Sequence, residues 1–221
     1  MKRLLSWIVM NKPYLISIAS WTPGVDDYVR SLLMLGDSVE WINVELEIYP
    51  GHLYRWDYIP KGLDRNRLFI FTDTADVIFQ APLPELDPKF IYVSDEGIKF
   101  KDNGFWMGVI ERNPRFKSLK ENQIYNVGTW AALGHIMDDW VEFVKKERGK
   151  TKNMVIEQLL FNVWLQDKEI TVHPNLFGTL YSSYSKGIIK LDHGIFYDNE
   201  HGIISIIHGN GDSKSLLKTN S

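Results

Sequence analysis

Leu68-Phe-Ile-Phe-Thr-Asp-Thr-Ala-Asp-Val-Ile-Phe79 is the segment from which the architecture of this chain is most readily predicted. Its first four residues form a short apolar run, which predicts a buried strand over 68–71. The run ends in Thr72-Asp73-Thr74-Ala75-Asp76, and apolar residues resume at Val77. Open α/β sheets bind ligands beyond the carboxyl ends of their strands. The two aspartates therefore lie where such a sheet would bind its ligand.

Strand and helix patterns alternate on both sides of this segment. Apolar runs predict further strands, whereas apolar residues at helical spacing predict helices. The strands are expected over 14–20, 39–46, 90–94, 188–191 and 203–207, with helices after Thr22, partly over 53–63, and around 136–144 and 156–164. Residues 94–125 show no clear pattern. The alternation predicts an α/β fold with a mixed, mostly parallel sheet flanked by helices, in a single domain over 1–221.

Composition excludes several classes of function. The formal net charge of −3 gives no polyanion-binding signal, so nucleic acid is not an expected partner. Cysteine is absent, which excludes disulfides, thiolate metal sites and a cysteine nucleophile. No run reaches the roughly 20 apolar residues of a membrane span. The apolar run after Arg3 is broken at Asn11-Lys12-Pro13 without a cleavage site, so a cytoplasmic protein is expected.

Asp73 and Asp76 form the first candidate for chemistry. Two carboxylates separated by two residues after a buried strand can turn toward one point, and their oxygens suit Mg²⁺ or Mn²⁺. The alternative is a pair of turn aspartates that hydrogen-bond to their own backbone. Taken alone, this pair is a weak signal, and the turn interpretation has at least as much weight as a metal site.

The second candidate is the C-terminal segment, where 203–207 runs into His208-Gly-Asn-Gly-Asp-Ser-Lys214. Histidine supplies a nitrogen ligand to metals. Glycines let backbone N–H groups approach phosphate closely, and lysine supplies a cation for a diphosphate. A surface loop near the chain end is the alternative. The combination of these residue types in one short string favours the functional interpretation.

These two strings resemble motifs of the glycosyltransferase domain of procollagen lysyl hydroxylase/glycosyltransferases. Phe71-Thr-Asp-Thr-Ala-Asp-Val77 is similar to the family's Phe-Thr-Asp-x-x-Asp-Val metal motif, and His208 to Lys214 is similar to its His-Gly-Asn-Gly-x-x-Lys motif. The resemblance implies the GT-A fold of nucleotide-diphospho-sugar transferases. It implies that Asp73, Asp76 and His208 hold Mn²⁺ (or Mg²⁺), and that Gly209, Asn210, Gly211 and Lys214 contact the UDP diphosphate.

The same resemblance implies weaker assignments on the donor side. Ala19, Ser20 and Trp21 fall where the first strand of such folds meets the nucleotide, which implies uridine contacts. Arg55, Trp56 and Lys61 precede the metal strand, in a region where the family also contacts the donor. A solvated helix face is an equal alternative for Arg55 and Lys61.

Three further matches concern the sugar. Tyr125-Asn126-Val-Gly-Thr129 resembles a Leu-Asn-Ser-Gly-Gly turn near the transferred sugar, with Val127 and Thr129 departing from it. Glu157-Gln158 stands where the family carries Asp-Gln, and a solvated helix face is the alternative. Asp95-Glu96 resembles an acidic position of the family.

The expected function is therefore metal-dependent transfer of a sugar from a UDP-sugar to a hydroxyl acceptor, which is a glycan, a protein or a small molecule. Glu157 and Asp95 are the expected general bases, should the reaction need one. Two alternatives stay open. The first is a nucleotidyltransferase of related fold, although 20–24 lacks the basic, glycine-rich loop that grips a triphosphate. The second is a non-catalytic protein that binds nucleotide sugars.

Overall fold

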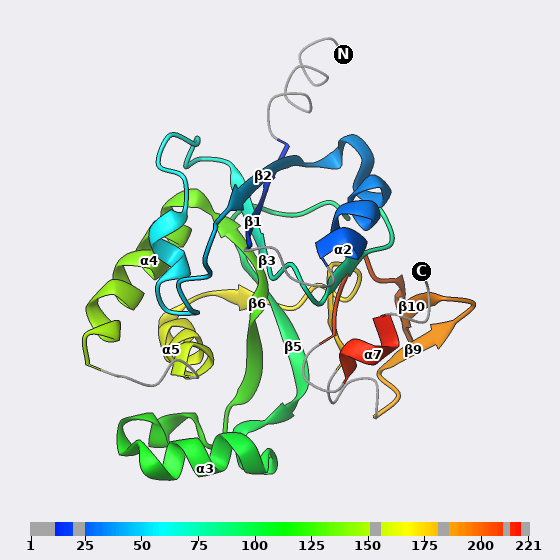
Figure 1. Cartoon of the computed structure of the whole chain (residues 1–221). Coiled ribbons are helices and arrows are strands. Elements are labelled where there is room, and N and C mark those ends of the chain that lie inside the picture. The colour runs from blue at the N-terminus through cyan, green and yellow to red at the C-terminus, as the bar shows by residue number, and fades with distance from the viewer. Residues whose placement is uncertain (1–11, 20–24, 151–155, 181–185, 210–212, 218–221) are drawn as a thin grey trace.

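A six-stranded mixed sheet forms the centre of the molecule, with the strand order β2-β1-β3-β6-β5-β7 (Figure 1). The computed structural model describes residues 12–19, 25–150, 156–180, 186–209 and 213–217. The strands are β1 (Tyr14–Ala19), β2 (Glu40–Glu45), β3 (Leu68–Thr72), β5 (Ile91–Lys99), β6 (Gln123–Leu133) and β7 (Ile170–Thr171). Only β6 runs antiparallel to its neighbours β3 and β5 in this sheet. The expected mixed, mostly parallel sheet is confirmed.

Helices cover both faces of this sheet. Helices α4 (Gly134–Arg148) and α5 (Glu157–Trp164) lie on one side and α2 (Val25–Ser31) on the other (Figure 1). Alternate residues of β3 enter two different cores: Phe69 and Phe71 pack in the core that holds α4 and α5, and Ile70 packs in the core that holds α2. Among the described helices, none combines the length and the apolar character needed to cross a bilayer.

Two three-stranded sheets complete the C-terminal part. In the first, β12 (Ile206–His208) lies between β4 (Val77–Phe79) and β8 (Phe177–Thr179). The second joins β9 (Ile189–Asp192), β10 (Ile195–Asp198) and β11 (Gly202–Ile203), and a short helix, α7 (Lys214–Leu217), follows β12. Antiparallel pairing places His208 opposite Val77. The last strand of the chain therefore ends beside the turn that follows β3.

The structure contains elements that the sequence did not predict, among them β4, β7 and β8. The unpatterned region 94–125 contains the end of β5, α3 (Gly104–Arg112), two 3-10 turns, η3 (Phe100–Asp102) and η4 (Pro114–Leu119), and the start of β6. Strand β6 is buried on both faces over most of its length, so it lacks the alternation that marks a half-buried strand. The expected strand over 203–207 is instead divided between β11 and β12, which belong to different sheets. The tail also contains β10, which was not predicted. Its hairpin turns at His193 and Gly194, both with positive φ.

Three smaller helical turns complete the described elements. They are the 3-10 segments η1 (Leu32–Ser38), η2 (Arg55–Tyr58) and η6 (Leu165–Asp167). The expected partly helical segment 53–63 corresponds to η2. This short turn carries Arg55 and Trp56 into the interior, where both are buried.

Candidate metal centre

Three potential metal ligands converge beyond the carboxyl ends of the central strands. Asp73 follows β3, Asp76 precedes β4, and His208 ends β12. One ligand atom from each residue lies within 4.8 Å of the others. His208 Nε2 is 3.4 Å from Asp76 Oδ1 and 3.8 Å from Asp73 Oδ2. Backbone hydrogen bonds fix the turn, since Asp73 N donates to Gly128 O and Gly209 N donates to Asp76 O.

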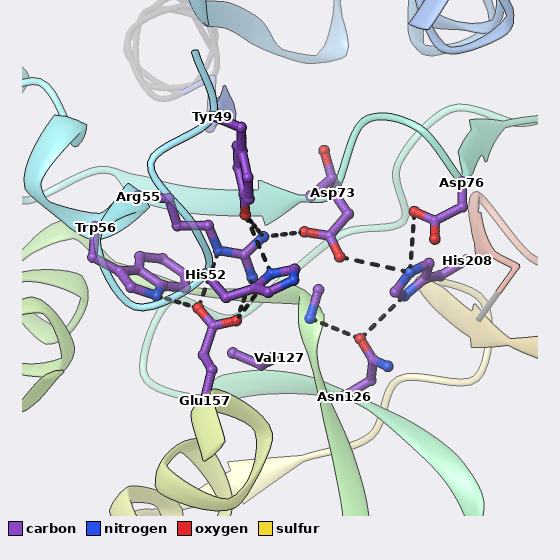
Figure 2. Close-up of polar contacts among 12 residues, drawn as sticks. Tyr49, His52, Arg55, Trp56, Asp73, Asp76, Asn126, Val127, Glu157 and His208 are labelled. Carbon is purple, nitrogen blue, oxygen red and sulfur yellow. Dashed lines mark hydrogen bonds and ion pairs between the residues drawn. The ribbon is translucent and has the colours of Figure 1, made fainter. Parts of the chain in front are cut away.

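Both aspartates are held through the oxygen that faces away from this point. Asp73 Oδ1 accepts a hydrogen bond from the Arg55 guanidinium, and Asp76 Oδ2 lies 2.7 Å from Lys214 Nζ. Figure 2 shows Arg55 behind Asp73, with Asp76 and His208 facing each other on the opposite side. Partners that hold the second atom of a ligand orient it and restrict its rotation. Asp73 Oδ2 and Asp76 Oδ1 are thereby left pointing toward the imidazole.

Electrostatic interactions within the cluster shift the pKa values of Asp76 and His208 in opposite directions. Burial would raise the pKa of Asp76, but His208 and Lys214 lower it well below its ordinary value. Burial would lower the pKa of His208, but the carboxylates of Asp76 and Asp73 raise it above its ordinary value. A cluster of carboxylates around one imidazole attracts either a proton or a metal cation.

Gly128 makes the close approach of these ligands possible. A Cβ atom at this position would lie 2.4 Å from Asp73 Oδ2, 2.6 Å from His208 Cε1 and 3.0 Å from Asn126 Oδ1. Real Cβ atoms do not make contacts this short, so any side chain at 128 would displace two of the three ligands. Gly128 lies in the segment that resembles a Leu-Asn-Ser-Gly-Gly turn. The short distances explain why this position needs a glycine.

A buried ionic cluster lies on the other side of Asp73. Both Glu157 oxygens accept hydrogen bonds from Arg55, from Nε at 3.0 Å and from Nη2 at 3.1 Å, and Trp56 Nε1 donates to the same carboxylate. Arg55 and Glu157 are each 3% exposed. Burial raises the pKa of Glu157 to about 7, against the opposing effect of Arg55. Glu157 is thus not on a solvated helix face, and its role as a base stays a prediction.

Two adjoining pockets open over these residues, with volumes of about 220 and 270 Å³. Their shared walls include Arg55, Asp73, Asp76 and Lys214. The first pocket extends toward Ala19 and Tyr49 at the end of β1, whereas the second extends toward Trp106, Val127 and Gln158. A third hollow of about 360 Å³ lies near Pro13 and Leu68, at the opposite ends of the strands. The candidate ligands therefore border a space open to small molecules.

The remaining predicted site residues fall into three groups. Ala19, Asn126 and Gln158 line the two pockets, and Gln158 also bonds to Tyr125 O and Val127 N. Asp95 accepts hydrogen bonds from Gly97 N and Gln123 Nε2, and Lys61 is exposed; neither borders these pockets, and both assignments stay predictions. Ser20, Trp21, Asn210 and Gly211 lie outside the described residues.

Sequence reasoning missed two residues that border the site. His52 lines both pockets, and Tyr49 lines the first and lies 3.2 Å from His52 Nδ1. His52 Nδ1 also lies 3.7 Å from Glu157 Oε2. Neither residue belongs to a motif, and both lie in the segment that precedes η2. No signal in the sequence pointed to either position.

The donor set fits a divalent cation. Two carboxylate oxygens and one imidazole nitrogen are the ligand types that Mn²⁺ and similar ions accept. The convergence of the three atoms, the partners behind Asp73 and Asp76, and the missing Cβ at Gly128 agree with such a site. Among the described residues, no other group of three such ligands is found.

No family model matches the sequence, and no curated protein matches it. Among solved structures, the chain is similar to the apo-form glycosyltransferase GlyE of Streptococcus pneumoniae TIGR4, with 12% identity and a TM-score of 0.50. The match covers 91% of this chain and 55% of GlyE, so the chain spans about half the length of that neighbour. The likeness does not extend to the procollagen-modifying subtype that the motifs resemble. What it shows is that this mixed α/β fold is shared with a glycosyltransferase.

Proposed function

We propose that this chain is a metal-dependent glycosyltransferase of the GT-A type, which transfers a sugar from a UDP-sugar to a hydroxyl acceptor. The observation that carries the proposal is the convergence of Asp73, Asp76 and His208 beside two pockets. Arg55 and Lys214 line the same pockets, so the site combines a cation position with positive charge. The fold shared with GlyE supports the choice, and we treat 1–221 as one such domain.

In this proposal Asp73, Asp76 and His208 hold Mn²⁺, with Mg²⁺ as the alternative. When bound, the cation neutralises charge that develops on the leaving diphosphate. Lys214 contributes a second positive charge. Its side chain is 53% exposed, it lines both pockets, and an ammonium group suits a phosphate oxygen. Backbone N–H groups from Gly209 to Gly211 are the proposed further phosphate donors.

The two pockets divide the donor between them. We assign the nucleotide to the pocket that reaches Ala19 and Tyr49, because it opens at the ends of β1 and β3. The transferred sugar and the acceptor hydroxyl belong in the pocket that reaches Trp106 and Gln158. Holding both reactants in adjoining pockets brings the acceptor oxygen to the anomeric carbon in a defined orientation.

Glu157 has a holding role in this proposal. Both of its oxygens already accept hydrogen bonds, so it immobilises Arg55 and through it Asp73. A base that takes a proton from an acceptor needs an oxygen within hydrogen-bond reach of that acceptor. Freeing a Glu157 oxygen for this purpose would break its hydrogen bond with Arg55. The buried guanidinium would then lose one of its partners.

The test is calorimetric titration of UDP into wild type and Asp76→Ala, with and without Mn²⁺. Binding to wild type that requires Mn²⁺, and that Asp76→Ala abolishes, is the expected result. Absence of UDP binding under both conditions contradicts the proposal in its UDP form. GDP and CMP in the same titration then show whether another nucleotide is the donor.

Turnover distinguishes the transferase from a protein that only binds nucleotide sugars. UDP released from a UDP-sugar in the presence of an acceptor, above its release without one, is expected of the transferase. Binding without release favours the non-catalytic alternative. Release of pyrophosphate from a nucleoside triphosphate favours the nucleotidyltransferase.

A further inference from the structure

A buried chain of hydrogen bonds lies behind His208. His208 Nδ1 is 3.0 Å from Asn126 Oδ1, and Asn126 Nδ2 is 2.9 Å from Glu96 Oε1. The three side chains are 3%, 3% and 1% exposed, respectively. They belong to β12, β6 and β5, so the chain connects the small sheet that carries His208 to the central sheet. Figure 2 shows Asn126 directly beneath the imidazole.

Two neighbours fix the orientation of the Asn126 amide. The backbone N–H of Gly128 can only donate, and it lies 2.7 Å from Asn126 Oδ1. On the other side of the amide, Glu96 Oε1 accepts from Asn126 Nδ2. If the amide were flipped, its NH₂ group would face the N–H donor of Gly128, and its oxygen would face the acceptor oxygen of Glu96. The oxygen of Asn126 therefore faces His208.

This orientation determines which imidazole nitrogen carries the proton. An amide oxygen can only accept, so His208 Nδ1 must donate to it. In the neutral ring the lone pair then lies on Nε2, which is the atom that faces Asp76 Oδ1 and Asp73 Oδ2. The ring is thereby prepared to coordinate through Nε2 without a change of tautomer.

We propose that Asn126 and Glu96 are positioning residues that fix the tautomer and orientation of His208 for metal coordination. The inference rests on the metal site of the proposed function, and it gives Asn126 a role other than sugar contact. Glu96 contributes by accepting the hydrogen bond from Asn126 Nδ2. Its neighbour Asp95 bonds instead to Gly97 N and Gln123 Nε2, because adjacent residues of a strand point to opposite faces.

Asn162 offers a matched control for Asn126. It is 4% exposed, donates to Tyr125 O and Gln158 O, and accepts from Tyr125 N. Asn126→Leu removes a buried amide that lies on β6, and Asn162→Leu removes a buried amide that bonds to β6. Both are expected to lower the thermal midpoint, but only the first removes a partner of a metal ligand. The comparison separates loss of positioning from general destabilisation.

The first measurement is the dissociation constant for Mn²⁺ alone, without nucleotide. Asn126→Leu is expected to weaken binding about 10- to 100-fold, the usual effect of removing a partner of a metal-bound histidine. Asn162→Leu is expected to leave the constant unchanged. Glu96→Leu is expected to weaken Mn²⁺ binding less than Asn126→Leu does. Glu96→Gln keeps a carbonyl oxygen that accepts from Asn126, and it is expected to restore the Mn²⁺ affinity that Glu96→Leu loses.

The second measurement is the tautomer of His208 in the metal-free protein, from long-range proton–nitrogen NMR at a pH where the ring is neutral. The His208 signals are those lost in His208→Gln. Wild type and Asn162→Leu are expected to carry the proton on Nδ1, and Asn126→Leu is expected to lose this preference. This readout needs neither metal nor nucleotide.

The outcomes separate the two proposals. A proton on Nε2 in wild type, or equal Mn²⁺ affinities for Asn126→Leu and Asn162→Leu, overturns the positioning role. The expected Mn²⁺ pattern together with absence of nucleotide binding overturns the transferase alone. Wild type that binds no Mn²⁺ overturns the metal site, and the positioning role with it.

Discussion

Two buried carboxylates each support one ligand of the candidate metal centre, and each does so through one intermediary. On the charged side Glu157 holds Arg55, which holds Asp73. On the neutral side Glu96 holds Asn126, which holds His208. Both sides orient a ligand through its second polar atom, but only the charged side places a full positive charge between two carboxylates.

The two sides are therefore expected to affect different properties of the protein, namely its folding stability and its affinity for metal. Removing one member of a buried ion pair leaves an uncompensated charge and costs far more than removing a neutral hydrogen bond. The charged side is therefore expected to determine whether the site folds. The neutral side, which carries no net charge in Asn126, is expected to determine how well a correctly folded site binds metal.

Arg55→Met is expected to have the largest effect. It leaves Glu157 buried without a cationic partner, so the free energy of unfolding should fall by about 3–5 kcal/mol. Urea unfolding measures this change. The control is Arg148→Met, which breaks the more exposed pair with Asp57 and should cost about 0–1 kcal/mol. Equal losses in the two variants would contradict the distinction between buried and exposed pairs.

Gly128→Ala is expected to disrupt the metal site itself, where the ligands supported by the two sides come together. The new Cβ would displace Asp73 and His208, and disturbing the position of metal ligands costs about 10- to 100-fold in metal affinity. Mn²⁺ affinity is the measurement. Gly108→Ala in α3 is the control, because its Cβ would meet nothing closer than 3.9 Å. Normal Mn²⁺ binding by Gly128→Ala would show that the ligands do not need this close packing.

The double variant Arg55→Met with Glu157→Leu sharpens the comparison. Replacing both charges by apolar groups removes the unpaired carboxylate, so about 1–3 kcal/mol of the loss in Arg55→Met should be recovered. Mn²⁺ affinity should stay low, because Asp73 has lost the guanidinium that orients it. Recovery of both quantities together would assign Arg55 a purely structural role.

Lys214→Met is expected to have the smallest effect on the protein itself. Lys214 is half-exposed, so its ion pair with Asp76 should contribute about 0–1 kcal/mol to stability. UDP affinity should fall about 10-fold through loss of one charged phosphate contact. Titration of UDP in the presence of Mn²⁺ measures it. Unchanged UDP affinity would remove Lys214 from the diphosphate site.

The site residues that were predicted from the sequence lie in short continuous segments. Asp73 and Asp76 lie within one turn, and His208 and Lys214 lie within one segment, and the resemblance to two family motifs paired them. The strands on which they depend, β3 and the end of β12, are short apolar runs. The mixed sheet followed from the same runs.

The supports behind the ligands could not be predicted in this way. Glu157 and Arg55 are 102 positions apart, and Asn126 and Glu96 are 30 apart on strands that pair with register shifts. Contacts of this kind depend on the topology of the sheet and leave no periodic pattern. The sequence pointed to Asp95, whereas the neighbouring Glu96 is the one bonded to Asn126.

The most direct test of the account is titration of Mn²⁺, followed by the EPR signal of the free ion, without and with UDP. Wild type should bind one ion per chain, and UDP should tighten it, since coupling between two ligands is reciprocal. His208→Gln should lose both the site and the coupling. If His208→Gln binds Mn²⁺ as tightly as wild type, or if UDP leaves the affinity of wild type unchanged, the metal–diphosphate site described here is contradicted.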